Sequence, residues 1–101
     1  MFKVTGEKYQ WKPNVLRNYV GSFEVINFRN ACEIWCLNVK KRNQNYGTQM
    51  LKEFVQKYNG NDPIVLYVTK RDTQSISMYE SAGFQIINEH NEYIWKMKYI
   101  Q

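Results

Sequence analysis

The most constraining feature of this 101-residue chain is an apolar run that passes through a basic turn into an amphipathic helix pattern. Residues 34–39 are rich in β-forming side chains and end at the triplet Lys40, Lys41 and Arg42. Beyond the turn, apolar side chains recur at helical spacing until Asn59 and Gly60, which predict a left-handed stop. The pattern predicts a strand, a positive turn and a helix that begins near residue 47 or 48. Its expected core residues are Met50, Leu51, Phe54 and Val55.

A turn that leads directly into a helix is suited to bind an anion. The first N–H groups of a helix have no partners within it and carry the positive end of the helix dipole, so they favour a phosphate. Gly47 lacks a Cβ atom, which permits a phosphate to approach the chain closely. The same residues also fit an ordinary strand-to-helix turn with a solvated cluster of charges, and the turn alone favours that interpretation.

Residues 72–84 predict a second helix. Asp72 is a good N-cap, Ile76, Tyr79 and Ala82 fall near one face, and Gly83 ends the helix before a new strand. Between the two helices, residues 63–68 are apolar without alternation, which is typical of a strand that is buried on both faces. The order strand, helix, strand, helix, strand predicts a mixed α/β sheet with both helices packed against it.

Together the two segments resemble the GCN5-related N-acetyltransferase (GNAT) family. The acyl-coenzyme A loop of that family reads Arg or Gln, x, x, Gly, x, Gly or Ala. Arg42, Asn45 and Gly47 match it, with Asn45 in place of the first glycine. Asn tolerates the left-handed backbone better than other non-glycine residues, so we expect the loop to keep its shape.

The later helix of the family reads Asn, x, x, Ala, then Leu-Tyr and, after a short gap, Gly-Phe. The matching residues here are Asp72, Ser75, Met78, Tyr79, Gly83 and Phe84. Asp72 and Ser75 are conservative departures from this pattern. The resemblance covers about residues 31 to 88 and implies a short, N-terminally reduced member.

The resemblance implies an α/β (α+β) fold with a GNAT-like mixed central sheet, two main flanking helices, and splayed parallel strands in the middle. It also implies acetyl-coenzyme A (acetyl-CoA) as co-substrate. The expected coenzyme site consists of the main chain of Leu37, Asn38 and Val39 for the pantetheine arm, and the N–H groups of Arg42, Asn43, Gln44, Asn45, Tyr46, Gly47 and Thr48 for the phosphates. Asp72 and Ser75 of the later helix complete this site.

The resemblance also gives two catalytic candidates. Tyr79 corresponds to the tyrosine that lies beside the thioester sulfur in many members, and a phenol with a reference pKa of ~10 can protonate a departing thiolate. An aromatic ring packed on the sheet is the alternative role of Tyr79. Glu33, upstream on the coenzyme-binding strand, is the candidate base for an amine of reference pKa ~10.4, and Glu24 is the reserve candidate. The single histidine, His90, is expected in a surface turn.

The remaining segments predict further strands. We expect a strand near residues 2–5, an irregular or partly helical stretch over 11–19, and a hairpin of residues 22–28 and 32–39 that turns at Arg29 and Asn30. Strands at 84–88 and 92–100 would close the chain, the last with Tyr93, Trp95, Met97 and Tyr99 on one buried face. Members of the family usually place a pair of helices in the region of residues 7–20, which here holds at most one short helix. A dimer partner or a macromolecular substrate would then complete the acceptor site.

The composition favours one folded domain over residues 1–101. Hydrophobic residues make up 44% and aromatic residues 16%, which argues against a disordered chain. No apolar stretch reaches transmembrane length and the N-terminus lacks the apolar core of a secretion signal, so we expect a cytoplasmic protein without membrane contact. Cys32 and Cys36 suit neither a zinc site nor a disulfide, and we expect buried free thiols and no metal.

The net charge of +5 is compatible with nucleic acid, an acidic protein or a polyanionic coenzyme as partner. The basic residues concentrate at Lys40, Lys41 and Arg42 and at Lys70 and Arg71, near the ends of two strands. If those strands are parallel, the two clusters lie at the same edge of the sheet and could meet the same phosphates.

The leading function is an N-acetyltransferase that transfers acetyl from acetyl-CoA to a primary amine of a small molecule or a protein lysine, by direct attack in a ternary complex. A homodimer is one way to complete the acceptor site. The alternative is a catalytically reduced coenzyme-binding or protein-interaction module of the same fold. A third interpretation is that the aromatic side chains stack on single-stranded nucleic acid. The sequence contains no recognisable motif for this function, and most of the aromatic residues are expected in the core.

Overall fold

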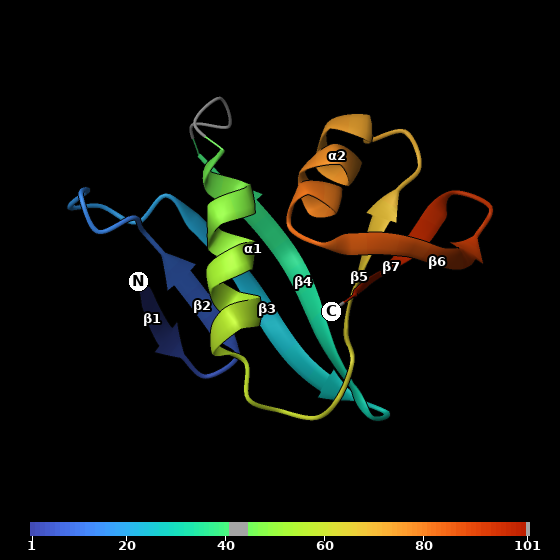
Figure 1. Ribbon diagram of the computed structural model, residues 1–101, viewed down its shortest axis with the longest axis horizontal. Helices are drawn as coiled ribbons and strands as arrows, with labels where there is room; N and C mark the ends of the chain where they lie inside the picture. The colour runs from blue at the N-terminus through green and yellow to red at the C-terminus, as the bar shows by residue number, and fades with distance from the viewer. Residues whose placement is uncertain (41–44, 101) are drawn as a thin grey trace.

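The computed structural model describes residues 1–40 and 45–100, which form a seven-stranded sheet and two helices. In chain order the elements are β1 (Phe2–Thr5), β2 (Lys8–Trp11), β3 (Gly21–Phe28), β4 (Ala31–Val39), α1 (Tyr46–Lys57), β5 (Ile64–Thr69), α2 (Thr73–Ser81), β6 (Phe84–Asn91) and β7 (Ile94–Tyr99). The order of strands in the sheet is β1-β2-β3-β4-β5-β7-β6 (Figure 1).

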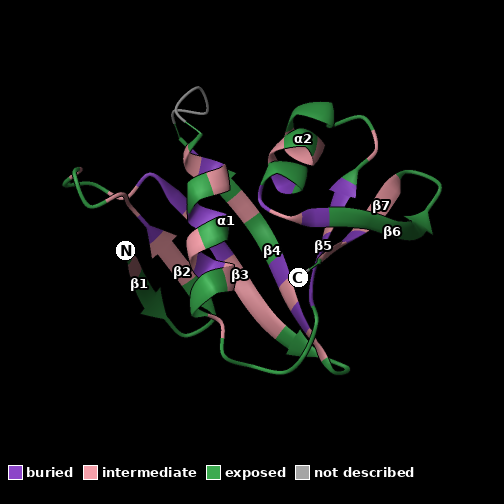
Figure 2. Cartoon of the chain, viewed as in Figure 1, coloured by how far each residue is buried: buried purple, intermediate pink, exposed green. Residues whose placement is uncertain are grey.

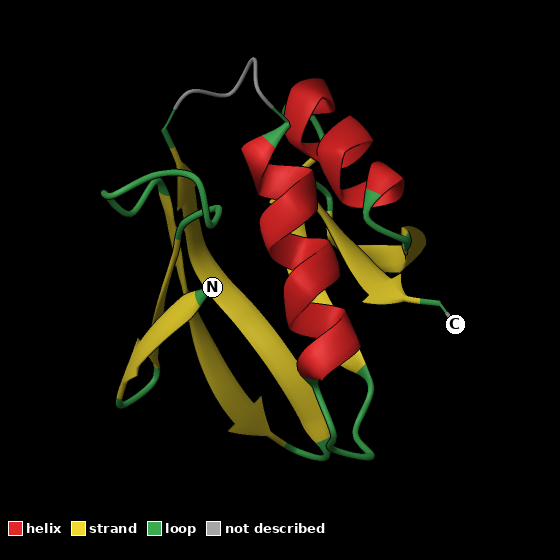
Figure 3. Cartoon of the chain, turned by 60° about the vertical axis from the view of Figure 1, so that its left-hand side comes forward, coloured by secondary structure: helices red, strands yellow, loops and turns green. Residues whose placement is uncertain are grey.

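All neighbouring strands are antiparallel except β4 and β5 at the centre, which are parallel. α1 connects β4 to β5 and α2 connects β5 to β6, and both helices lie on the same face of the sheet (Figure 3). Right-handed crossovers produce this arrangement, because the chain moves in the same direction across the sheet at each one. The mixed fold predicted from the sequence is therefore confirmed.

The core lies between this face and the helices. Met50, Leu51 and Phe54 of α1 are almost completely buried, which confirms the face predicted from their spacing. Val55 and Ile76 are only partly buried. Each fully buried side chain of this size contributes about 1.5–3 kcal/mol to folding. Figure 2 shows that the buried parts of α1 alternate with exposed ones along its length, as expected for an amphipathic helix.

The irregular stretch predicted over residues 11–19 is confirmed from residue 12 onward, but Trp11 belongs to β2, a strand that the sequence did not predict. β2 extends to Trp11 and pairs with both β1 and β3, and residues 12–20 contain no helix. An aromatic cluster explains the pairing. This cluster has ring centroids 5.2 to 6.4 Å apart and consists of Phe2, Tyr9, Phe23 and Phe54. Within it, Tyr9 of β2 stacks on Phe23 of β3.

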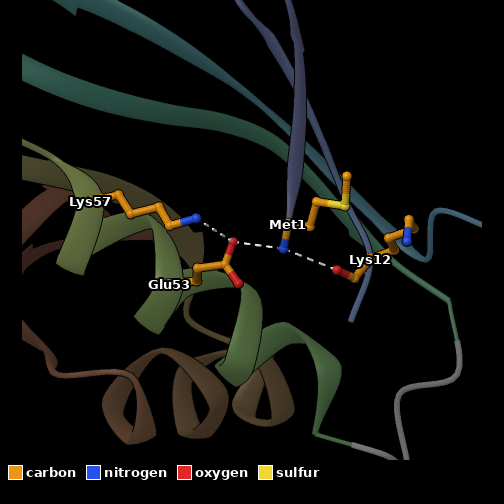
Figure 4. Close-up of polar contacts among 4 residues, drawn as sticks. All are labelled: Met1, Lys12, Glu53 and Lys57. Atoms are coloured by element: carbon orange, nitrogen blue, oxygen red, sulfur yellow. Dashed lines mark hydrogen bonds and ion pairs between the residues drawn. The ribbon is translucent and has the colours of Figure 1, made fainter. Parts of the chain in front are cut away.

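Polar contacts also fasten the first hairpin to α1. The Glu53 carboxylate accepts from the ammonium of Met1 at 2.7 Å and from Lys57 Nζ at 3.4 Å. The Met1 ammonium also donates to the main-chain oxygen of Lys12 at 3.1 Å. Figure 4 shows Glu53 between Met1 and Lys57, so one side chain of α1 ties the start of β1 to the helix.

The end of α1 differs from the predicted left-handed stop. The helix ends through Tyr58, which is extended at φ −68° and ψ 120°, and Gly60 does not have a positive φ. A Cβ atom at Gly60 would instead collide with the ring of Tyr58. Gly60 is thus explained by the close approach of that ring. At the end of α2 the prediction is confirmed, because Gly83 has φ +102°.

The C-terminal hairpin is longer on β6 and shorter on β7 than predicted. His90 lies on β6 and not in a turn, and Tyr93 is in the turn with 66% of its surface exposed. The predicted buried face is therefore reduced to Met97, which is fully buried, with Trp95 and Tyr99 packed partly against the core. β6 is an edge strand that is exposed beyond its first residue (Figure 2).

Among the described residues, no helix is both long and apolar enough to cross a membrane.

Candidate functional site

The two parallel strands separate toward their carboxyl ends. Their pairing joins Cys32 with Ile64, Glu33 with Val65 and Ile34 with Leu66. Beyond these pairs β4 continues to residue 39 and β5 to residue 69 without further pairing to each other. The sheet therefore opens at the edge where both helices begin, which confirms the splayed parallel strands predicted for the middle of the sheet.

A β-bulge on β4 controls what this opening presents. Cys36 has φ 54°, and Glu24 pairs with Trp35 whereas Ser22 pairs with Asn38. Two steps on β3 thus oppose three steps on β4, and Cys36 is the extra residue. The bulge leaves the Cys36 thiol exposed, so its predicted burial is wrong, whereas the buried free thiol predicted at Cys32 is confirmed. A hydrogen bond to the neighbouring Glu24 carboxylate raises the pKa of the Cys36 thiol.

The bulge also reverses the alternation of side chains along β4. Ile34 packs into the core beneath the helices, so a regular strand would turn Leu37 and Val39 to the opposite face. With one extra residue between them, both side chains instead face the helices, where Val39 is buried and Leu37 partly buried. The carboxyl-terminal end of β4 therefore presents apolar side chains toward α1.

A cleft of 660 Å³ lies between the end of β4, the start of α1 and one side of α2. Of the residues predicted for the coenzyme site, those at the end of β4 and the start of α1 that line the cleft are Leu37, Val39, Asn45, Gly47 and Thr48. Asp72 and Ser75, at the start of α2, line it as well, together with the catalytic candidate Tyr79. The fold thus brings together two motifs that are about 30 residues apart in the sequence, around a space of the size that ligand pockets have.

Asn45 has the left-handed conformation predicted for it. Its φ of 58° and ψ of 25° make it the N-cap of α1, and its carbonyl oxygen accepts from the N–H of Gln49 at 3.1 Å. The first turn of α1 contains no acidic side chain. The positive end of the helix dipole is therefore not neutralised from within the helix, and it lies at the cleft.

Gly47 has a structural role that the sequence did not reveal. The residue is buried, and a Cβ atom there would collide with the sulfur of Met78 on α2. Next to it, Thr48 Oγ1 donates to the main-chain oxygen of Met78 at 3.5 Å. Gly47 thus allows α1 and α2 to pack closely at the edge of the cleft, whereas its predicted role in the approach of a phosphate stays a prediction.

α2 presents a polar side to the cleft. Asp72 accepts from the N–H of Ser75 at 3.1 Å, which confirms the predicted N-cap. The sequence reasoning missed several lining residues of this helix: Thr73, Gln74, Ser77, Met78 and Ser81. The spacing of four between Thr73, Ser77 and Ser81 was the available signal, since residues at that spacing share one face of a helix.

Other predicted site residues do not line the cleft. Asn38 is exposed beyond the bulge, and the ring of Tyr46 packs 6.1 Å from that of Trp11. Arg42, Asn43 and Gln44 lie outside the described residues.

The second basic cluster does not face the cleft as expected. Lys70 Nζ pairs with Glu89 at 2.6 Å and lies 4.3 Å from the ring centre of Trp95, so it is held against β6 and β7. Of the first cluster, Lys40 is exposed at the end of β4, and Lys41 and Arg42 are outside the described residues. The expectation that both clusters meet the same phosphates is therefore wrong for Lys70.

The two catalytic candidates occupy different surroundings. Tyr79 lines the cleft and is 8% exposed, with its ring packed into the core. Glu33 lies outside the cleft, where one carboxylate oxygen accepts from Trp35 Nε1 at 2.9 Å and the other from the Tyr67 hydroxyl at 3.3 Å. Burial raises the pKa of the Tyr67 hydroxyl, and the adjacent carboxylate raises it further.

Within residues 1–40 and 45–100, no cluster of three or more His, Cys, Asp or Glu side chains could hold a metal ion.

Solved structures with this architecture are similar over nearly the whole chain. The N-acetyltransferase PseH of Campylobacter jejuni, in complex with acetyl coenzyme A, superposes with a TM-score of 0.70 over 96% of this chain at 16% identity. The chain has the GNAT fold. An IAA acetyltransferase from Bacillus cereus and the spermidine N-acetyltransferase of Vibrio cholerae, in complex with CoA and spermine, give TM-scores of 0.71 and 0.69 at 15% identity.

The resemblance to GNAT enzymes that the two motifs indicated is thus confirmed in the fold. This GNAT-fold chain spans 70% of the Campylobacter enzyme and 75% of the Bacillus enzyme, but only 63% of the Vibrio enzyme. No protein-family model and no curated protein matches its sequence.

Proposed function

We propose that this protein is an acyl-CoA-dependent N-acetyltransferase that transfers acetyl from acetyl-CoA to a primary amine of a small molecule or a protein lysine. The observation that carries the proposal is the cleft itself. It combines the left-handed Asn45, the positive N-terminal end of the α1 dipole and the edge of β4 that is not paired with β5. Solved structures with this fold hold acetyl-CoA or CoA.

The residues of the cleft fit the coenzyme. The N–H groups at the start of α1, at Tyr46, Gly47 and Thr48, would bind its diphosphate, because they carry partial positive charge and lack acceptors within the helix. The main chain of Leu37 to Val39 would hold the pantetheine arm as an added strand, since no described strand pairs with this part of β4 on the side toward β5. Acetyl-CoA supplies the acyl group as a thioester.

We assign the proton transfers to Tyr79 and Glu33. The amine nitrogen forms the new C–N bond and the C–S bond breaks, so the amine must lose one proton and the thiolate must gain one. Tyr79, which lines the cleft, would donate that proton from its hydroxyl and regain one from solvent. Glu33 accepts the proton of the amine, because its carboxylate has capacity beyond the two hydrogen bonds that it already accepts.

Acetyl-CoA binding tests the first part of this proposal. We expect the coenzyme to raise Tm, and we expect Asn45→Val to weaken its binding about tenfold, since a β-branched residue in the left-handed region costs roughly 1–2 kcal/mol. Asn45→Gly is the matched control, because glycine adopts the same conformation without strain. Isothermal titration of both variants would contradict the proposal if they bound acetyl-CoA equally well or not at all.

Release of free CoA thiol with a panel of amines and lysine peptides tests the second part. A coenzyme-binding module without catalysis is the second candidate function. It is favoured by the open face of the sheet, where the described residues place no helix over a potential acceptor site. Binding of acetyl-CoA without thiol release from any acceptor would decide for this module.

A further inference from the structure

A compact aromatic and acidic cluster lies on the sheet face that the helices leave uncovered. The rings of Trp35 and Tyr67 are 5.2 Å apart, and the ring of His90 lies 4.6 Å from that of Tyr67. Glu33 is held between the first two, with one oxygen on the Trp35 indole N–H and the other on the Tyr67 hydroxyl. Four side chains from β4, β5 and β6 thus form one connected unit.

This unit lies at the opening between the two parallel strands. Ile34 and Leu66 form the last pair between β4 and β5, and both pack into the core beneath the helices. Trp35 and Tyr67 follow them directly, so they point to the opposite face. Their rings therefore meet across the point where the strands begin to separate. The cleft opens on the helix side of this gap and the ring pair lies on the other side.

The chemistry of the unit suits an ammonium group. A carboxylate offers about four acceptor positions, and Glu33 uses two of them internally, which leaves room for donors from a ligand. Trp35 is 39% exposed, so part of its ring remains accessible. An aromatic face attracts a cation, and tryptophan does so most strongly. We propose that Trp35, Tyr67 and Glu33 bind the ammonium group of the acceptor amine and hold it at the gap between β4 and β5.

This proposal rests on the proposed acetyl transfer and adds a substrate class to it. Glu24 is the pairing partner of Trp35 and adds a second acidic group beside the unit. Lys96 and Lys98 pair with Tyr67 and Val65, and directly opposed residues share one face of a sheet. The face is therefore acidic toward β3 and basic toward β7. A monoamine matches this distribution, whereas a polyamine would bring further positive charge toward the two lysines.

The test measures the amine kinetics of Trp35→Leu with n-butylamine at saturating acetyl-CoA. We expect KM for n-butylamine to rise about 5- to 30-fold, since the variant loses a cation–π contact together with the indole hydrogen bond that holds Glu33. Tyr93→Leu is the matched control, because Tyr93 is an aromatic residue with 66% exposure in the turn between β6 and β7. Spermidine should have a lower kcat/KM than n-butylamine in the wild-type protein.

Binding without turnover provides a second readout. In nuclear magnetic resonance spectra, the indole N–H signal that disappears in Trp35→Leu should shift with n-butylammonium chloride and stay in place with n-butanol. If the wild type acetylates n-butylamine and Trp35→Leu leaves KM unchanged, the amine site is wrong while the transferase function stands. A preference for spermidine overturns the single-cation assignment. If no amine releases CoA thiol, the proposed function fails, and an equal response to butylammonium and butanol would then overturn the site as well.

Discussion

At the scale of single residues, Tyr79 combines a structural and a proposed chemical role. Its ring belongs to the core and is 8% exposed, yet the residue also lines the cleft. Packing alone requires only the ring, whereas protonation of a thiolate requires the hydroxyl. Removal of the hydroxyl from an otherwise intact ring separates the two roles.

We expect Tyr79→Phe to lower kcat about 100-fold while the Kd for acetyl-CoA changes less than about twofold, because general acid catalysis contributes about 10²–10⁴ to a rate. Steady-state kinetics and isothermal titration provide the two values. Tyr79→Ala serves as the contrast, since loss of a buried aromatic ring costs roughly 3–5 kcal/mol and should lower Tm strongly. Parallel losses of kcat, affinity and Tm in Tyr79→Phe would identify Tyr79 as a packing residue only.

The sequence predicted one of the two unusual backbone positions beside the cleft. Asn45 could be recognised because asparagine is enriched in the left-handed region and the residue stands where the family has a glycine. Cys36 could not, because cysteine has no such preference and the bulge depends on how β3 and β4 align. The exposure of its thiol therefore required the structure.

At the scale of elements, the contact of α1 with α2 at Gly47 determines one wall of the cleft. A side chain at this position meets the Met78 sulfur. We expect Gly47→Ala to lower the free energy of unfolding by about 1 kcal/mol through overpacking. In the background of Met78→Ala, which removes the sulfur, the same substitution should cost nothing in stability. Thermal or urea unfolding of the four proteins in this cycle measures the coupling.

Acetyl-CoA affinity in the same four proteins separates packing from phosphate approach. If the bare Cα of Gly47 also admits a phosphate, the double variant regains stability but still binds acetyl-CoA about tenfold more weakly than Met78→Ala. Equal affinities of those two proteins would show that Gly47 serves helix packing alone.

The elements that the sequence predicted well are those with strong local patterns. The helix face of Met50, Leu51 and Phe54 and the hairpin turn at Arg29 and Asn30 agree with the structure, where both turn residues have positive φ. β2 was missed, because four residues carry too little alternation to recognise and its pairing depends on distant aromatic rings. The left-handed stop predicted at Gly60 was wrong, because a glycine after a helix does not by itself require a positive φ, and this one instead leaves space for the ring of Tyr58.

At the scale of the whole molecule, the two faces of the sheet differ in what covers them. The helices close one face over an apolar core and form the cleft at its edge, while the other face keeps an exposed aromatic and acidic unit. The motifs predicted the first face because they lie on its helices. The second face could not be predicted, because Trp35 and Tyr67 are 32 positions apart and meet only through the pairing of β4 with β5.

The attachment of the first hairpin to α1 gives the whole molecule a pH-dependent component of stability. Burial of the Glu53 carboxylate acts to raise its pKa, but the Met1 ammonium, the Trp11 indole and the Lys57 ammonium outweigh this effect and lower the pKa below the ordinary value of 4.5. Trp11 Nε1 has no hydrogen-bond partner among the described residues, whereas the ion pair of Glu53 with Met1 measures 2.7 Å, and Met1 lowers the pKa of Glu53 the most.

Because the pKa of Glu53 is lower in the folded state, its ionised form stabilises the fold fully above about pH 4.5, and this contribution is lost as the pH falls through the folded value. We expect Glu53→Gln to cost about 0.5 kcal/mol at pH 7, or about 2–4 °C in Tm, and progressively less below pH 4.5. Glu80→Gln is the control, since Glu80 is exposed on α2 and has no ion pair among the described residues. Thermal unfolding from pH 3 to 7 decides the matter: a difference between Glu53→Gln and the wild type that stays constant over this range would mean that Glu53 acts through packing and not through its charge.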